Sequence, residues 1–64
     1  MTTKWPSAKE AKEVFEDGLL DGGQGWVAYD PDIYCNRHPL SVQAHVLVLY
    51  TGGFMTALEK NDNG

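Results

Sequence analysis

Residues 45–58 read HVLVLYTGGFMTAL, two apolar runs rich in β-branched and aromatic residues that are separated by Gly52 and Gly53. Two such runs joined by two glycines are typical of a β-hairpin, because a type I′ turn needs a positive φ at both central residues and glycine adopts it without strain. The sequence therefore predicts a hairpin over about 43–60. A helix over 41–51 is the alternative, since a short apolar run fits either period.

The predicted hairpin would be apolar on both faces. Because side chains alternate along a strand and paired residues share a face, one face would carry Leu47, Leu49, Phe54 and Leu58, and the other Val46, Val48, Tyr50, Met55 and Ala57. Antiparallel sheets covered on one side normally alternate apolar and polar residues. We therefore expect the second face to be covered by the polar loop, by a second copy of the chain or by another protein.

An amphipathic helix precedes the hairpin. Residues 7–10, SAKE, form a capping box in which the Ser7 hydroxyl accepts the backbone N–H of Glu10. An apolar stripe with helical spacing follows, and Gly18 is placed to end the helix in the left-handed conformation. A helix is thus predicted over about 7–17.

The middle of the chain predicts a turn, a strand and a loop. The glycine cluster at 22–25 indicates the turn, the run WVAY predicts a strand over about 25–29, and the polar segment that follows is expected to be a loop over about 30–41. Residues 61–64 are expected to form a frayed tail. The predicted fold class is α+β: one domain spanning 1–64, with an N-terminal helix packed on a small antiparallel sheet of about three strands.

Composition limits the function classes. The 64-residue chain has a net charge of −4 and only five Lys and Arg residues, which disfavours nucleic acid as a partner. It has no apolar run of about 18 residues for a membrane span, and its first residues lack the pattern of a signal peptide. A lone cysteine, Cys35, forms no internal disulfide and is most simply a reduced thiol. We therefore expect a cytoplasmic protein that does not bind membranes.

One cluster of polar residues contains possible metal ligands and a thiol, but its spacing does not predict a metal site or a catalytic cysteine. Asp30, Asp32, Cys35 and His38 lie within nine residues. A structural zinc site needs four ligands, and one Cys-x-x-His pair supplies two. A catalytic cysteine is normally oriented by a histidine distant in sequence. We expect no metal, no cofactor and no enzymatic activity.

The acidic residues are concentrated in one part of the chain and suggest an interface. Residues 9–32 hold seven acids and two bases, and three of the acids crowd the predicted C-terminal end of the helix, where the helix dipole disfavours them. Rigid aromatic side chains and an arginine follow, the residue types that anchor interfaces. The alternative for the acids is a solvated face that keeps the protein soluble. The predicted partner-binding residues are Glu13, Glu16, Asp17, Asp21, Tyr29, Tyr34 and Arg37.

These observations favour a non-enzymatic protein-binding module, an inhibitor or an adaptor that occupies the surface of another protein bearing a basic patch. The chain is similar to the small acidic proteins with which bacteriophages and mobile elements inhibit host enzymes or defence systems. This analogy rests on size and composition alone. The alternative is an accessory subunit that is stable only in a homodimer or a larger assembly, because a chain of 64 residues buries little apolar surface by itself.

Overall fold

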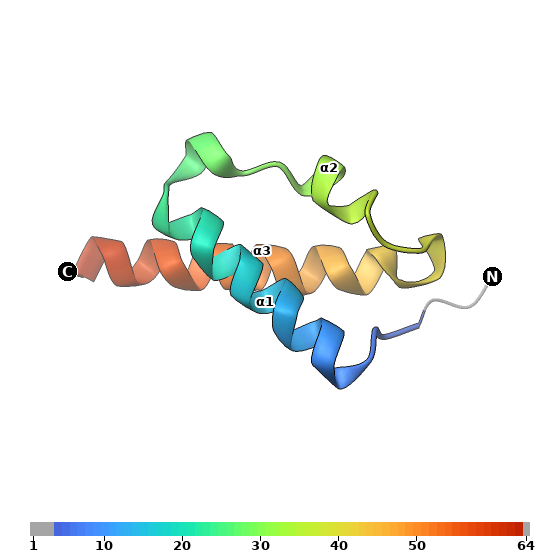
Figure 1. The fold of residues 1–64 in the computed structure, drawn as a ribbon. Coiled ribbons are helices and arrows are strands. Elements are labelled where there is room, and N and C mark those ends of the chain that lie inside the picture. The colour runs from blue at the N-terminus through green and yellow to red at the C-terminus, as the bar shows by residue number, and fades with distance from the viewer. Residues whose placement is uncertain (1–3, 64) are drawn as a thin grey trace.

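The protein is all-helical. A computed structural model describes residues 4–63 and contains the helices α1 (Ala8–Gly23), α2 (Pro31–Cys35) and α3 (Leu40–Asn63), with a short 3-10 helix, η1 (Trp26–Ala28). Helices α1 and α3 cross each other, and the segment between them, residues 24–39, lies beside both (Figure 1). We call residues 24–39 the connecting arm. The predicted α+β class is wrong, since no residue from 4 to 63 forms a strand.

Helix α1 begins as its capping box predicts and ends later. Ser7 is the N-cap, and its hydroxyl accepts the Glu10 N–H at 3.2 Å. Gly18 does not end the helix, which continues for more than a turn to Gly23. The predicted boundary at residue 17 is therefore wrong, because Gly18 serves a contact with another helix and not a turn.

Helix α3 replaces the predicted hairpin over 43–60. Its buried residues recur every three or four positions, as one face of a helix requires: Val42, Val46, Tyr50, Gly53, Phe54 and Ala57. Gly52 and Gly53 lie inside the helix and form no turn. The alternative helix over 41–51 is the correct type of structure there. Helix α3 continues through residues 61–63 of the tail that was expected to fray over 61–64, and residue 64 lies outside the described residues.

Glycines allow α1 and α3 to pack backbone against backbone. A Cβ added to Gly18 would overlap the carbonyl oxygen of Tyr50 and lie 3.0 Å from the Phe54 nitrogen. A Cβ on Gly22 would lie 2.7 Å from the Ala57 Cβ, and one on Gly53 would overlap the Phe15 carbonyl oxygen. Glycine inside a helix costs about 1 kcal/mol relative to alanine. Here the close approach of the two helices requires it at each of these positions.

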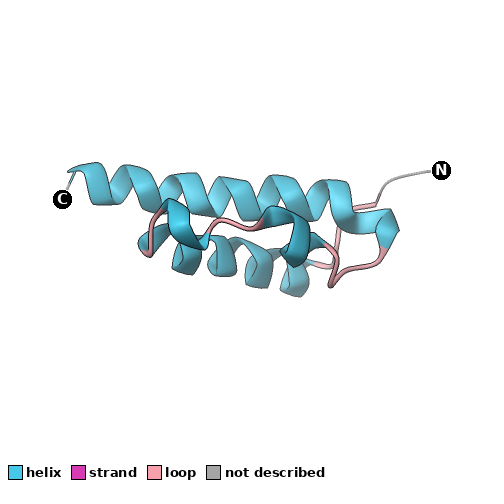
Figure 2. Cartoon of the chain, turned by 90° about the horizontal axis from the view of Figure 1, so that it is seen from above, coloured by secondary structure: helices cyan, strands magenta, loops and turns pink. Residues whose placement is uncertain are grey.

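The connecting arm is helical where a strand and a loop were predicted. Gly25, with φ at 87°, redirects the chain into η1, which occupies the predicted strand at 25–29. Asp30 caps α2 through its side chain, and Pro31 occupies the first turn, where a missing N–H costs nothing. The predicted loop at 30–41 therefore holds α2 and the start of α3. Viewed from above, the arm and α1 lie on the same side of α3 (Figure 2).

The hydrophobic core lies between α1, α3 and the connecting arm. Val14 of α1 belongs to one buried cluster with Val42, Val46 and Tyr50 of α3, and the arm adds Tyr34 and Cys35 to it. Trp26, in contrast, is exposed. In the part of the chain that the structure describes, no helix combines the length and the hydropathy needed to cross a membrane.

Candidate functional site

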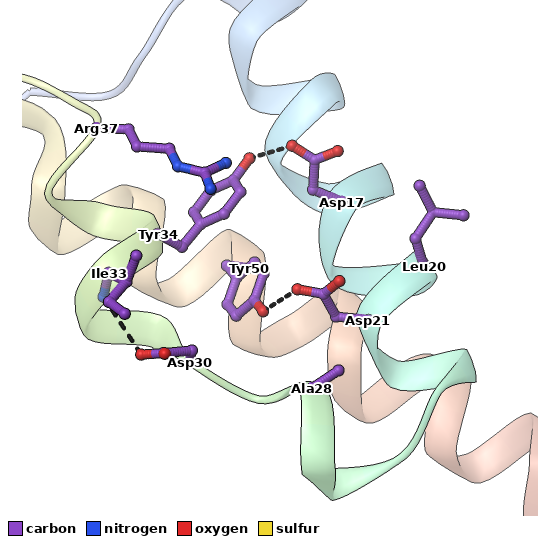
Figure 3. A pocket seen from close by; sticks show the side chains of 9 residues that line it. All are labelled: Asp17, Leu20, Asp21, Ala28, Asp30, Ile33, Tyr34, Arg37 and Tyr50. Atoms are coloured by element: carbon purple, nitrogen blue, oxygen red, sulfur yellow. Dashed lines mark hydrogen bonds between the residues drawn. The ribbon is translucent and has the colours of Figure 1, made fainter.

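A pocket of about 350 Å³ opens where the connecting arm faces α1 (Figure 3). Its wall on one side is α1, its opposite wall is the arm, and Tyr50 of α3 lies between them. The residues that line it are Asp17, Leu20, Asp21, Ala28, Asp30, Ile33, Tyr34, Arg37 and Tyr50. Segments distant in sequence therefore build the pocket together.

Two stacked tyrosines form the base of the pocket. The rings of Tyr34 and Tyr50 lie 4.5 Å apart, centroid to centroid, and are nearly parallel. The Tyr34 hydroxyl donates a hydrogen bond to Asp17, and the Tyr50 hydroxyl donates one to Asp21. Asp17 and Asp21 are four residues apart on α1 and so lie on the same side of the helix. Each tyrosine thus joins another element to α1.

Burial and these hydrogen bonds keep both phenols protonated. Burial is the larger cause, and with the hydrogen bond to Asp21 it raises the pKa of Tyr50 to about 12. Burial and the hydrogen bond to Asp17 likewise raise the pKa of Tyr34. Only 1% of Tyr50 is exposed. The two tyrosines therefore act as hydrogen-bond donors over the whole physiological range of pH.

Within residues 4–63, no basic group forms an ion pair with the carboxylates of the pocket. Asp30 accepts a hydrogen bond from the Ile33 N–H at 3.4 Å, and Asp17 and Asp21 each accept one from a tyrosine hydroxyl. Among residues 4–63 the structure forms a single ion pair, between Lys12 and Glu16, which lies outside the pocket. Arg37 lines the pocket with its guanidinium carbon 5.6 Å from the centre of the Tyr34 ring, and it forms no ion pair with these aspartates. The pocket thus carries three carboxylates and one guanidinium.

Two exposed apolar side chains border the acidic groups. Leu20 of α1 and Ile33 of α2 line the pocket, and 67% and 58% of their surfaces respectively are exposed. Large exposed aliphatic side chains beside polar groups are common at binding sites. The pocket therefore combines an aromatic base, acidic walls and an apolar rim.

The structure brings together four of the predicted partner-binding residues, Asp17, Asp21, Tyr34 and Arg37. Tyr29 lies next to the pocket, where its ring stacks on Tyr50 at 6.2 Å and its hydroxyl is 3.3 Å from that of Thr51. Glu13 and Glu16 lie on α1 outside the pocket. The helix-dipole reason for choosing them is wrong, because α1 continues to Gly23 and places them in its middle.

Sequence reasoning missed two central residues of the pocket. Tyr50 was assigned to the face of a strand, so its neighbours could not be inferred. Asp30 was considered as a metal ligand and counted among the acids of residues 9–32, and it was not assigned to a binding site. The sequence did contain a signal for the helix that Asp30 begins, because Asp followed by Pro is typical of the start of a helix.

Cys35 and His38 form no reactive pair. Cys35 is buried, and burial raises the pKa of its thiol, which disfavours the nucleophilic thiolate. The His38 ring packs against Tyr34, with centroids 5.6 Å apart. Between residues 4 and 63 no three His, Cys, Asp or Glu side chains are grouped so that they could hold a metal ion.

Comparisons with protein-family models, with curated proteins and with solved structures gave no match to this chain.

Proposed function

We propose that the chain is a non-enzymatic protein-binding module, an inhibitor or an adaptor, that takes a basic side chain of its partner into the acidic pocket. The observation that carries this proposal is a set of three carboxylates, Asp17, Asp21 and Asp30, that form no ion pair within residues 4–63 and surround a base of stacked tyrosines. We propose a cytoplasmic location, in which the single thiol of Cys35 would stay reduced.

The carboxylates have the capacity to accept further hydrogen bonds. Each ionised carboxylate offers about four acceptor positions, and each of the three uses one in the hydrogen bonds described. A guanidinium or an ammonium group supplies several donors without an acceptor, so it matches this surplus. The charge of the pocket also attracts a basic surface as the two proteins approach each other.

The carboxylates and the apolar rim favour arginine over lysine, because a planar guanidinium binds a carboxylate through two hydrogen bonds. The guanidinium carbon of Arg37 lies 5.6 Å from the centre of the Tyr34 ring, so this end of the pocket already accommodates a guanidinium. The space between Asp21 and Asp30, beside the covered ring of Tyr50, is left for a group from the partner. Leu20 and Ile33 would contact the aliphatic part of that side chain.

The titratable groups support binding and not catalysis. Both phenols are held in their protonated form by burial and by the aspartates they contact. The only thiol of the chain, that of Cys35, is buried with a raised pKa. A catalytic nucleophile or base needs a pKa near the working pH, and the pKa values of these groups are raised further above it.

Minimal ligands test the pocket directly. We expect L-arginine amide to shift the NMR signals of Asp21, Asp30 and Ile33 in the millimolar range, as a single contact of this kind allows. L-citrulline amide is the matched control, because it is nearly isosteric with arginine and uncharged. Equal shifts with both compounds, or shifts outside the pocket only, would overturn the proposal.

Two variants that remove the same number of charges distinguish binding in the pocket from attraction by the overall negative charge of the protein. Replacing Asp17, Asp21 and Asp30 by Asn removes three charges and keeps an oxygen for the two phenols and for the cap of α2. Replacing Glu10, Glu13 and Glu16 by Gln removes three charges from α1 outside the pocket. We expect the first variant to lose arginine amide binding and the second to retain it. Equal losses in both would reduce the site to nonspecific charge attraction.

A further inference from the structure

The acidic pocket contains groups of both charges that do not neutralise each other. Arg37 lines it together with the carboxylates of Asp17, Asp21 and Asp30. In the part of the chain that the structure describes, no ion pair joins the guanidinium to any of these carboxylates. A guanidinium has five N–H donors and no acceptor, whereas an ionised carboxylate only accepts. Both kinds of group therefore retain the capacity to bind a ligand.

Arg37 is held at one end of the pocket. Its backbone N–H donates to the Tyr34 carbonyl at 3.2 Å, in the turn that follows α2. Its guanidinium carbon lies 5.6 Å from the centre of the Tyr34 ring, within the range of a cation–π interaction. In Figure 3 the guanidinium lies beside this ring on the arm, with Asp17 across from it on α1. The positive charge therefore marks one end of the pocket, and Asp21 with Asp30 marks the other.

We propose that the group which the pocket takes from its partner is a C-terminal arginine. The guanidinium of that residue binds between Asp21 and Asp30, and its α-carboxylate binds Arg37 through charge-assisted hydrogen bonds. This inference rests on the proposed function and makes it more specific. The partner offers the end of its chain, where one residue carries both charges.

The dimensions of the pocket fit such a ligand. A volume of about 350 Å³ lies at the lower end of the range for ligand pockets and suits one residue better than a longer segment. Asp17, at the end near Arg37, and Asp21, at the other end, lie about 6 Å apart along α1 at 1.5 Å per residue. In an extended arginine, bonds of about 1.5 Å place the guanidinium carbon about 7 Å from the carboxyl carbon. One arginine residue therefore spans the two ends.

Asp17 and the solvent limit the strength of the contact with Arg37. Asp17 lies at the same end of the pocket and repels a carboxylate, although one of its oxygens accepts the Tyr34 hydroxyl. Arg37 is exposed, and ion pairs at exposed positions change an affinity by up to about fivefold. We therefore expect the α-carboxylate to tighten binding by about two- to fivefold.

Two ligands that differ only at the carboxyl group test the inference. N-acetyl-L-arginine has the free carboxylate of a chain end, and N-acetyl-L-arginine amide represents an arginine within a chain. Their binding is followed by NMR titration in about 0.15 M salt, which screens charges beyond about 8 Å. We expect the wild-type protein to bind the first ligand about two- to fivefold more tightly. The Arg37 Nε–H signal should shift with that ligand only.

Variants of Arg37 test which residue reads the carboxylate. Arg37→Gln should reverse the preference, because the carboxylate then meets only the negative charges of the pocket. Arg37→Lys keeps the charge without the planar pair of donors and should retain part of the preference. Lys12→Gln is the matched control, since it removes the same charge from α1 outside the pocket, and it should not change the preference. Circular dichroism checks that each variant remains helical.

The outcomes separate this inference from the proposed function. If the wild-type protein binds the amide and gains nothing from the carboxylate, the C-terminal arginine is overturned and the proposed function stands. The same holds if Arg37→Gln keeps the full gain, or if Lys12→Gln loses it as well. If neither ligand shifts the signals of the pocket, both proposals are overturned.

Discussion

Gly53 of α3 lies against Phe15 of α1 so closely that a Cβ on Gly53 would overlap the Phe15 carbonyl oxygen and lie 3.1 Å from the Leu19 nitrogen. Its neighbour Gly52 has no such constraint, since a Cβ there would have the Phe15 ring as its nearest neighbour, at 3.9 Å. Adjacent glycines in one helix thus have different roles. The difference gives a sharp test of the fold.

Gly53→Ala should lower the free energy of unfolding by about 1–3 kcal/mol, because the two backbones must move apart. Gly52→Ala should raise it by about 0.5–1 kcal/mol, since alanine favours the helix and meets only ordinary contact. Urea denaturation at low protein concentration, where association does not contribute, measures both. Similar losses from the two substitutions would indicate a glycine turn and contradict the helix.

Stability should fall in alkaline solution as the buried tyrosines ionise. The pKa of Tyr50 rises from 10.0 to about 12 on folding, so the folded state favours the neutral phenol. Its contribution is complete below pH 10 and is lost as the pH rises through 12. The difference corresponds to about 3 kcal/mol, at 1.36 kcal/mol per pKa unit. Urea denaturation across this pH range measures the loss, and Tyr50→Phe should show a smaller one. A flat profile in the wild-type protein would contradict the buried phenol.

The thiol of Cys35 should react slowly with an aromatic disulfide reagent. Burial hides the sulfur and raises its pKa, so both access and the fraction of thiolate are reduced. We expect the native protein to react at least about tenfold more slowly than the urea-unfolded protein at the same pH. Equal rates would place Cys35 on the surface.

The segment before α1 should loosen when His45 is removed. The Lys4 N–H donates to the Ser41 carbonyl at 2.7 Å, His45 Nδ1 lies 2.8 Å from the Lys4 carbonyl, and the Trp5 ring packs on His45 at 3.9 Å between centroids. We expect His45→Ala to accelerate tryptic cleavage after Lys4, because proteolysis follows local opening. Cleavage after Lys9, within α1, is the internal control and should not change. Unchanged cleavage after Lys4 would show that His45 does not hold this segment.

The start of α1 could be predicted because its capping signal is local: the Ser7 hydroxyl accepts the Glu10 N–H within one turn. Its end could not, because Gly18 was interpreted from its neighbours in sequence, whereas its role depends on Tyr50 and Phe54 in another helix. The same holds for Gly52 and Gly53. Two glycines between apolar runs favour a turn locally, and only the contact between α1 and α3 makes a helix preferable.

A helical signal was present in residues 42–57, since the buried residues follow a spacing of three and four. It was masked because the intervening positions are also apolar, which removes the contrast that reveals a period. The acidic residues, Tyr34 and Arg37 were recognised as binding candidates from residue type alone. Tyr50 and Asp30 were missed as pocket residues, because their role depends on the fold.

The tyrosine–aspartate contacts of the pocket have a thermodynamic consequence. Each contact joins a donor on one element to an acceptor on another, so the pocket does not exist in the unfolded chain. A ligand that binds only the folded state stabilises it by RT ln(1 + [L]/Kd), about 2.7 kcal/mol at a concentration one hundred times Kd. For a domain of about 60 residues this is a large part of the stability to be expected. Occupation of the pocket would therefore lengthen the lifetime of the protein as well as hold its partner, and the unbound molecule would be the one that unfolds and is degraded.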